Sequence, residues 1–258
     1  MGIFSRFIST FGPGDTGRET GLPTSSNRAS SMHVRWIGSF RRAEAVEVDL
    51  TIITPPSSRH LHFWALQATF AQGTHNLGAG HLGLQWIDGH PGQTAVNWGG
   101  YETGGHILDG TDSLLPSALG NPHTRDYSWS AGTTYRLRID RGTSGWRGSV
   151  TDLATGAVTV VRELLAGGDQ LSGFVMWSEV FAPCEGPSTT VAWSRPVVFS
   201  SDEATPATQF ELSYQSFEDG GCTNTNTSIE TIGQGSAIVQ RTAIPRVNPP
   251  GSALTIHP

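Results

Sequence analysis

The chain has 258 residues, of which 36% are hydrophobic and 15% are charged, and its formal net charge is -6. This mild acidity argues against a nucleic acid or an anionic membrane surface as partner, because both reward clustered basic residues. No stretch of 18 apolar residues occurs, so the sequence predicts no membrane span.

The first 30 residues are rich in Gly, Ser, Thr and Arg and show no periodicity, which predicts a flexible N-terminal arm over residues 1–30. Arg6 interrupts the apolar opening segment, so the uninterrupted apolar run that a secretory signal needs is not visible. Localisation is left open between the cytoplasm and export by a route that the sequence does not show.

Residues 31–243 alternate apolar and polar side chains over short segments separated by Gly, Pro, Ser and Asp. A period of two is what a strand with one buried face requires, and Tyr135, Leu137 and Ile139 show it most clearly. We therefore predict an all-β fold, an antiparallel β-sandwich of the jelly-roll type, followed by a Pro-rich tail over 244–258. The expected strands are 33–40, 45–54, 61–71, 81–88, 94–101, 133–141, 146–152, 157–164, 172–181, 189–199 and 207–216, with a further one over 237–244.

The longest stretch without a clear strand is 103–131, and a loop of this length in a compact domain is usually functional or disordered. Its aromatic residues and the Arg125-Asp126 pair favour order. For Arg125 two interpretations stand side by side: an internal ion pair with Asp126 that ties the loop down, or contact with a ligand.

Three short motifs carry a family resemblance. They are His81-Leu-Gly-Leu-Gln85, the Gly-rich segment Asn97-Trp-Gly-Gly-Tyr-Glu-Thr-Gly-Gly105, and Trp129-Ser-Ala-Gly-Thr-Thr-Tyr-Arg-Leu137. Together they resemble an uncharacterised bacterial domain family that is similar to concanavalin A-like lectin and glucanase sandwiches. The resemblance covers about residues 34–181. It implies a β-sandwich and transfers no catalytic residue.

Trp177 and Glu179 share one face of the strand predicted over 172–181, opposite Phe174 and Met176. A sugar ring can stack on an aromatic side chain while a carboxylate accepts hydrogen bonds from its hydroxyls. The alternative is structural, with Trp177 packed under a loop and Glu179 paired with an arginine. The candidate ligand-binding residues are Trp177, Glu179, Trp98, Tyr101, Arg125 and Gln85.

We therefore expect a lectin-like module that binds carbohydrate of unknown specificity. Two alternatives remain: a polysaccharide-cleaving enzyme, hydrolase or lyase, on the same fold, and a structural or interaction domain without a small ligand. Glycoside cleavage needs two carboxylates across the scissile bond, and Glu102, Asp126 or Glu163 are candidates to complement Glu179.

Cys184 and Cys222 lie in Pro/Gly-rich segments and either form a disulfide or remain two reduced thiols. No cofactor is expected, although Asp219, Asn224 and Asn226 offer oxygen atoms of the kind that bind calcium. Asn and Asp more often serve turn geometry in such loops. The sequence leaves the oligomeric state open.

Overall fold

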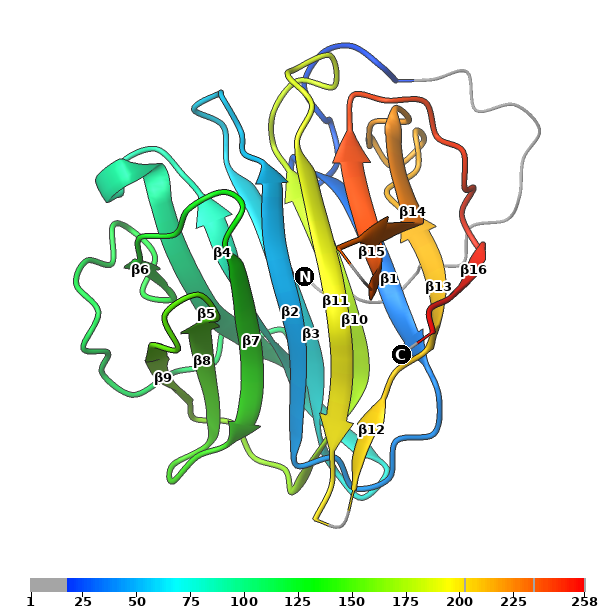
Figure 1. Cartoon of the computed structure of the whole chain (residues 1–258). Helices are drawn as coiled ribbons and strands as arrows, with labels where there is room; N and C mark the ends of the chain where they lie inside the picture. Colours follow the sequence, from blue (N-terminus) through cyan, green and yellow to red (C-terminus); the bar gives the residue numbers. More distant parts are fainter. Residues whose placement is uncertain (1–17, 202, 234, 258) are drawn as a thin grey trace.

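The structure is a computed structural model that describes residues 18–201, 203–233 and 235–257. Two antiparallel sheets pack face to face, which confirms the predicted all-β sandwich (Figure 1). Among the described residues there is no α-helix, and the one helical piece is a single 3-10 turn over Pro91–Gln93. No described helix is long and apolar enough to cross a membrane.

The first sheet carries the candidate site and has β10 and β3 near its centre. Its strands, from one edge to the other, are β16 (Ala253–Thr255), β13 (Gln209–Tyr214), β1 (Ser30–Ile37), β10 (Gln170–Val180), β3 (His62–Gln72), β4 (His75–Trp86), β5 (Thr94–Glu102) and β6 (Thr124–Asp126).

The second sheet faces the viewer in Figure 1. Its strands, in order, are β14 (Thr225–Ile232), β15 (Gly235–Thr242), β11 (Thr190–Phe199), β2 (Ala45–Thr54), β7 (Thr134–Arg141), β8 (Trp146–Asp152) and β9 (Val158–Leu164), and β12 (Ala204–Pro206) pairs with β11.

Every strand predicted from alternation overlaps an observed one, but the predicted end segments need correction. The supposed C-terminal tail contains β16, which pairs with β13, because Leu254 and Ile256 bury their side chains in the core. Residues 18–29 of the predicted arm pack against the domain, where Thr24 N–H donates to Gly220 O at 2.9 Å. Residues 1–17 lie outside the described part of the chain.

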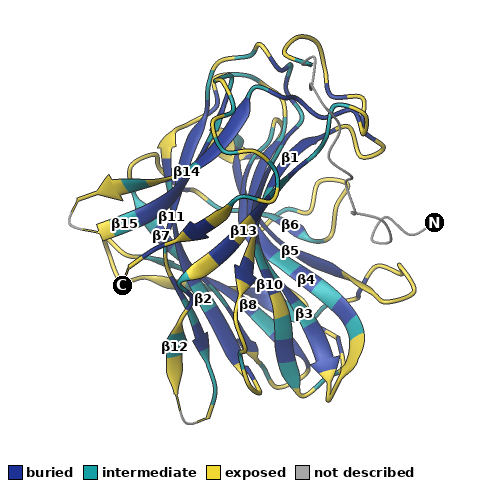
Figure 2. Cartoon of the chain, turned by 90° about the vertical axis from the view of Figure 1, so that its right-hand side faces the viewer, coloured by how far each residue is buried: buried dark blue, intermediate teal, exposed yellow. Residues whose placement is uncertain are grey.

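The core between the sheets is dominated by large aromatic side chains. Trp64, Trp98, Trp146 and Trp193 are at most 1% exposed, and Phe70 stacks on Trp146 with ring centroids 5.7 Å apart. Figure 2 shows the buried residues concentrated between the two layers. Aromatic burial on this scale is a large stabilising contribution.

One buried amide joins the layers. Gln240 of β15 accepts hydrogen bonds from Ser178 Oγ at 2.6 Å and Trp193 Nε1 at 2.9 Å, and its Nε2 donates to Met32 O at 3.0 Å. Since each buried polar partner is satisfied, the amide links strands of both sheets without an unpaired group.

A disulfide joins Cys184 and Cys222, which settles the question that the sequence left open. Cys184 follows β10 of the first sheet and Cys222 precedes β14 of the second, so the bond ties the layers together at one end.

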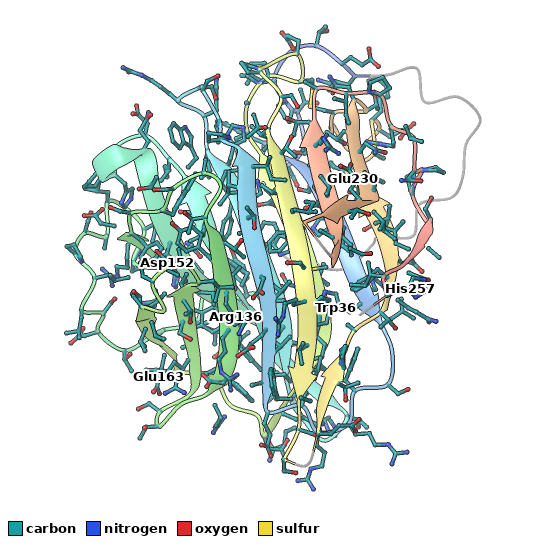
Figure 3. The ribbon with its side chains drawn as sticks, in the orientation of Figure 1. Trp36, Arg136, Asp152, Glu163, Glu230 and His257 are labelled. Atoms are coloured by element: carbon teal, nitrogen blue, oxygen red, sulfur yellow. A yellow bond between two sulfur atoms is a disulfide. The ribbon has the colours of Figure 1, made fainter. Side chains whose placement is uncertain are left out.

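The outer surface of the second sheet carries a series of ion pairs across β2, β7 and β8. Arg136 of β7, labelled in Figure 3, holds Asp49 in a two-pronged contact at 2.7 and 3.0 Å. The shortest contacts across the strands are Arg136–Asp49, Arg138–Glu47 and Arg147–Asp140. Opposite charges across neighbouring strands stabilise a sheet modestly.

Candidate functional site

The candidate site lies on the surface of the first sheet that points away from the core, called here the outer face. Directly paired residues of antiparallel strands point to the same side of a sheet, so the register groups this face into rows. The rows are Ser31–Glu179–Phe63–Gln85, His33–Trp177–Ala65–Gly83–Asn97 and Arg35–Val175–Gln67–His81–Gly99.

An aromatic cluster occupies the middle of the outer face. Trp177 lies with its ring centroid 4.9 Å from Phe63, 5.8 Å from His81 and 6.1 Å from His33. Tyr101 extends the cluster, with its ring 5.8 Å from His81, and is 40% exposed. Trp177 itself is only 7% exposed, so Tyr101 offers the more accessible aromatic surface.

Glu179 lies beside this cluster without a cationic partner among the described residues. Its Oε1 accepts hydrogen bonds from Asn27 Nδ2 at 3.0 Å and from Ser31 Oγ at 3.3 Å. Burial raises the pKa of Glu179 from 4.5 to about 7, and the two hydrogen bonds offset only part of that effect. The carboxyl therefore changes protonation state near neutral pH.

The two histidines of the cluster stay neutral through the same range. Burial lowers the pKa of both His33 and His81 to about 4, with a smaller contribution from Arg35 to His33 and from His123 to His81. Trp177 Nε1 is buried and has no hydrogen-bond partner in the described chain. The face thus combines one titrating carboxyl with uncharged imidazoles and an unused N–H donor.

Gln85, one of the candidate ligand-binding residues, lies on the outer face, but its side chain is bonded to other residues of the protein. Thr124 Oγ1 donates to Gln85 Oε1 at 3.2 Å and accepts from Asn97 Nδ2 at 2.8 Å, and all three side chains are buried. Phe63 stands between Gln85 and Glu179 in the register row.

Two of the sequence-predicted residues lie away from this cluster. Trp98 is fully buried between the sheets, and its Nε1 donates to Trp146 O at 3.2 Å. The prediction that Trp98 contacts a ligand is therefore wrong. Arg125 forms no ion pair with Asp126, which instead contacts His90 Nδ1 at 2.6 Å. The Arg125 Nη1 donates to Ser117 O at 2.9 Å in the long loop.

The carboxylates proposed as partners of Glu179 serve elsewhere. Glu163 lies on β9 of the second sheet and accepts backbone N–H groups of Thr143, Ser144 and Gly145. Asp126 is held by His90, and Glu102 is exposed at the end of β5. The arginine partner that the structural alternative assigned to Glu179 is also wrong, since the partners of Glu179 are an amide and a hydroxyl.

The side chains considered for calcium are occupied by local hydrogen bonds. Asn224 Nδ2 donates to Cys184 O, Asn226 Oδ1 accepts from the backbone N–H of Val247 and Asn248, and Asp219 accepts from Ser216. Within the described residues no group of three or more His, Cys, Asp or Glu side chains is arranged to hold a metal.

The residues that surround Glu179 from other segments of the chain were not predicted from the sequence. Ser31 and His33 alternate with Met32 and Val34, which is a period-two signal that places them on one face. The pairing of β1 with β10, and the approach of Asn27, join segments about 150 residues apart and leave no local signal.

Comparison with known proteins does not assign this chain to a family. No family model matches it, and no curated protein matches it. Among solved structures it is similar to scytalido-glutamic peptidase bound to a peptide-based transition state analog, at a TM-score of 0.41 and 12% identity over 82% of this chain and 97% of that one. It is also similar to SCP-B, a member of the Eqolisin family of peptidases, in complex with the tripeptide Ala-Ile-His, at a TM-score of 0.41 and 12% identity over 83% and 98% of the two chains. Similarity at this level carries no argument about the site.

Proposed function

We propose that this chain is a hydrolase in which Glu179 is the general acid–base. The observation that carries the proposal is a carboxyl on the outer face, without a cationic partner among the described residues, whose pKa is about 7. A general acid or base works best when its pKa lies near the working pH, and environments that shift a carboxyl in this way are concentrated at catalytic sites.

The hydrogen bonds of Glu179 suit this role. Asn27 and Ser31 both donate to Oε1, which fixes the carboxyl and leaves Oε2 for a proton. In the ionised form, Oε2 would take a proton from a water that attacks a substrate carbonyl carbon. The same proton would then pass to the leaving nitrogen or oxygen as that bond breaks.

A carbonyl oxygen that gains negative charge in this reaction needs a hydrogen-bond donor. Trp177 Nε1, two residues from Glu179 on the same strand face, is a buried donor without a partner in the described chain. Hydrolysis of an acyl group, as in a peptide amide, can be catalysed by one carboxyl that acts as acid and base together with such a donor.

Glycoside cleavage is the weaker enzymatic alternative, because it needs a second carboxylate about 5–10 Å away. On the outer face, Glu211 of β13 is two strands across and two register rows along from Glu179. Asp126 is held by His90. Neither of these described carboxylates is placed beside Glu179.

The test is cleavage of a fluorogenic peptide library by the wild-type chain and by Glu179→Gln, with Glu211→Gln as matched control. We expect release by the wild type, half-maximal near pH 7 and rising with pH, as Glu179 ionises. The Glu179→Gln variant should lose about 100-fold or more, the usual contribution of a general acid–base. The proposal fails if the folded Glu179→Gln variant cleaves at the wild-type rate, or if the wild type cleaves no member of the library.

Carbohydrate binding by the same face is the second candidate. The observation that favours it is Tyr101, an exposed ring next to neutral His81 on a surface whose other groups are largely uncharged. A glycan array with wild type and Tyr101→Ala tests it, and binding lost in the variant supports it. A silent array with the wild type would rule this candidate out.

A further inference from the structure

A group of cationic and imidazole side chains lies where the two sheets approach each other at β5, β6 and β9. Arg162 comes from β9, Arg125 from β6, and His123 from the position directly before β6. Arg162 is 5% exposed, and its guanidinium donates from Nε and Nη2 to Trp98 O at 3.3 and 3.2 Å. It also contacts His123 Nδ1.

These guanidinium groups lack the partners that buried arginines usually have. Within the described residues, neither Arg125 nor Arg162 forms an ion pair with a carboxylate, and their side-chain hydrogen bonds go to carbonyl oxygens and to the His123 ring. Burial and the charge of Arg125 lower the pKa of Arg162, while the charge of Asp109 acts in the opposite direction. A buried positive charge is costly unless an anion compensates it.

The protonation state of His123 follows from its contact with Arg162. A guanidinium has only donors, so His123 Nδ1 must accept and Nε2 must carry the ring proton. His123 Nε2 is buried without a partner, and so is Arg125 Nε. Two unused donors therefore lie in one cluster that carries two positive charges.

The cluster borders the outer face. The His123 ring packs on Gly99, where a Cβ would lie 2.8 Å from His123 Cγ, and Gly99 pairs with His81 in the register. Any side chain at Gly99 would displace the ring. The glycine thus keeps His123 against the edge of the same surface that carries Trp177 and Tyr101.

We propose that Arg125, His123 and Arg162 form a binding site for an oxyanion, a carboxylate or phosphate group of a ligand. Arg125 Nε and His123 Nε2 donate hydrogen bonds to its oxygens. Arg162, which contacts the other nitrogen of the His123 ring, adds a second positive charge. This proposal stands on contacts separate from those of Glu179. It holds or fails independently of the hydrolase function.

The experiment measures thermal unfolding with inorganic phosphate and, in a second arm, with acetate, each against chloride at equal ionic strength. Phosphate at about tenfold its Kd should raise the wild-type Tm by about 3 °C. Arg125→Gln should weaken apparent phosphate affinity about tenfold or more, because it removes a charge-assisted hydrogen bond. Arg35→Gln, at an exposed arginine of the outer face, is the control and should respond as the wild type does.

His123→Phe provides a second variant that keeps a ring over Gly99 and removes both nitrogens. It should lose the phosphate response, and in the wild type the His123 imidazole NMR signals should shift saturably with phosphate. A response to acetate as well would identify a general oxyanion site, and a response to phosphate alone a phosphate site. No response of the wild type to either anion, or an unchanged response in both folded variants, overturns the proposal.

Discussion

Glu179 has an unusual combination of neighbours for a carboxyl on a sheet surface. It has two uncharged donors on one oxygen and aromatic side chains nearby, without a described cation. The folded chain therefore holds the proton of Glu179 over a range in which the unfolded chain has released it. Ionisation of this residue costs the folded state free energy.

The consequence is a stability difference that depends on pH. Because the folded pKa of about 7 exceeds the ordinary 4.5, stability falls as pH rises from about 4.5 to 7 and is constant above. We expect Glu179→Gln to raise the free energy of unfolding by roughly 1–3 kcal/mol at about pH 8. At about pH 4.5 it should change little, as measured by denaturant titration.

Glu211→Gln, at an exposed position, should show no such difference between the two pH values. A large loss of stability in Glu179→Gln at about pH 8 would contradict this account. It would mean that the carboxylate balances a positive charge.

At the scale of single residues, the sequence predicted the position of Trp177 and Glu179 but neither the burial of Trp98 nor the partners of Glu179. Alternation placed Trp177 and Glu179 on one face, because Phe174, Met176 and Val180, which occupy the alternate positions of this strand, are apolar. The same rule should have placed Trp98 in the core, since Trp98 alternates in phase with the buried Val96. The Gly-rich surroundings of Trp98 obscured that signal. The partner Asn27 is 152 residues from Glu179, beyond any local rule.

At the scale of elements, strands with strong alternation were predictable, including the edge strand β9, whereas the edge strands β6, β14 and β16 were not. β14 consists mainly of Thr, Asn, Ser and Glu, with little apolar content, because it lies at a sheet edge and pairs on one side only. β16 has three residues and follows several prolines, so its pairing with β13 depends on tertiary packing of Leu254.

The Cys184–Cys222 bond closes a loop of 38 residues between elements of different sheets. Constraint of the unfolded chain by such a loop contributes about 4 kcal/mol on the chain-entropy model. We expect Cys184→Ser/Cys222→Ser to lower the free energy of unfolding by about 2–4 kcal/mol in denaturant titrations. Reducing agent should destabilise the wild type equally and leave the double variant unchanged. Equal stability of both proteins without reductant would contradict the expectation.

For the whole molecule, the two outer surfaces differ in chemistry. The second sheet carries paired charges on β2, β7 and β8, whereas the middle of the first sheet carries neutral histidines, aromatic rings and one titrating carboxyl. Buried imidazoles also occur beyond the candidate site. Burial lowers the pKa of four histidines to about 4: His33, His62, His81 and His123.

The lowered pKa values of these four histidines predict that the folded chain loses stability in mild acid. Between about pH 6.5 and 4 the unfolded chain binds protons that the folded chain does not, so stability falls as pH decreases. Glu179 opposes this fall. We expect a net loss of roughly 2–5 kcal/mol from about pH 7 to 5 in denaturant titrations. The loss should be steeper in Glu179→Gln, and an unchanged free energy of unfolding across this range would contradict the prediction.

The strand order also determines when the chain can fold during synthesis. β3, β4 and β5 follow one another in both sequence and space, as do β7, β8 and β9, so each meander can form locally. The centre of the first sheet needs β10 between β1 and β3, and that of the second needs β11 beside β2. A nascent chain therefore leaves β1 without a partner until Val180 has been made, and it leaves β2 paired on one side only, with β7, until Phe199 has been made. Long-range pairing of this kind is slow and exposed to misassembly. Assembly of the two sheets must wait until most of the polypeptide has left the ribosome.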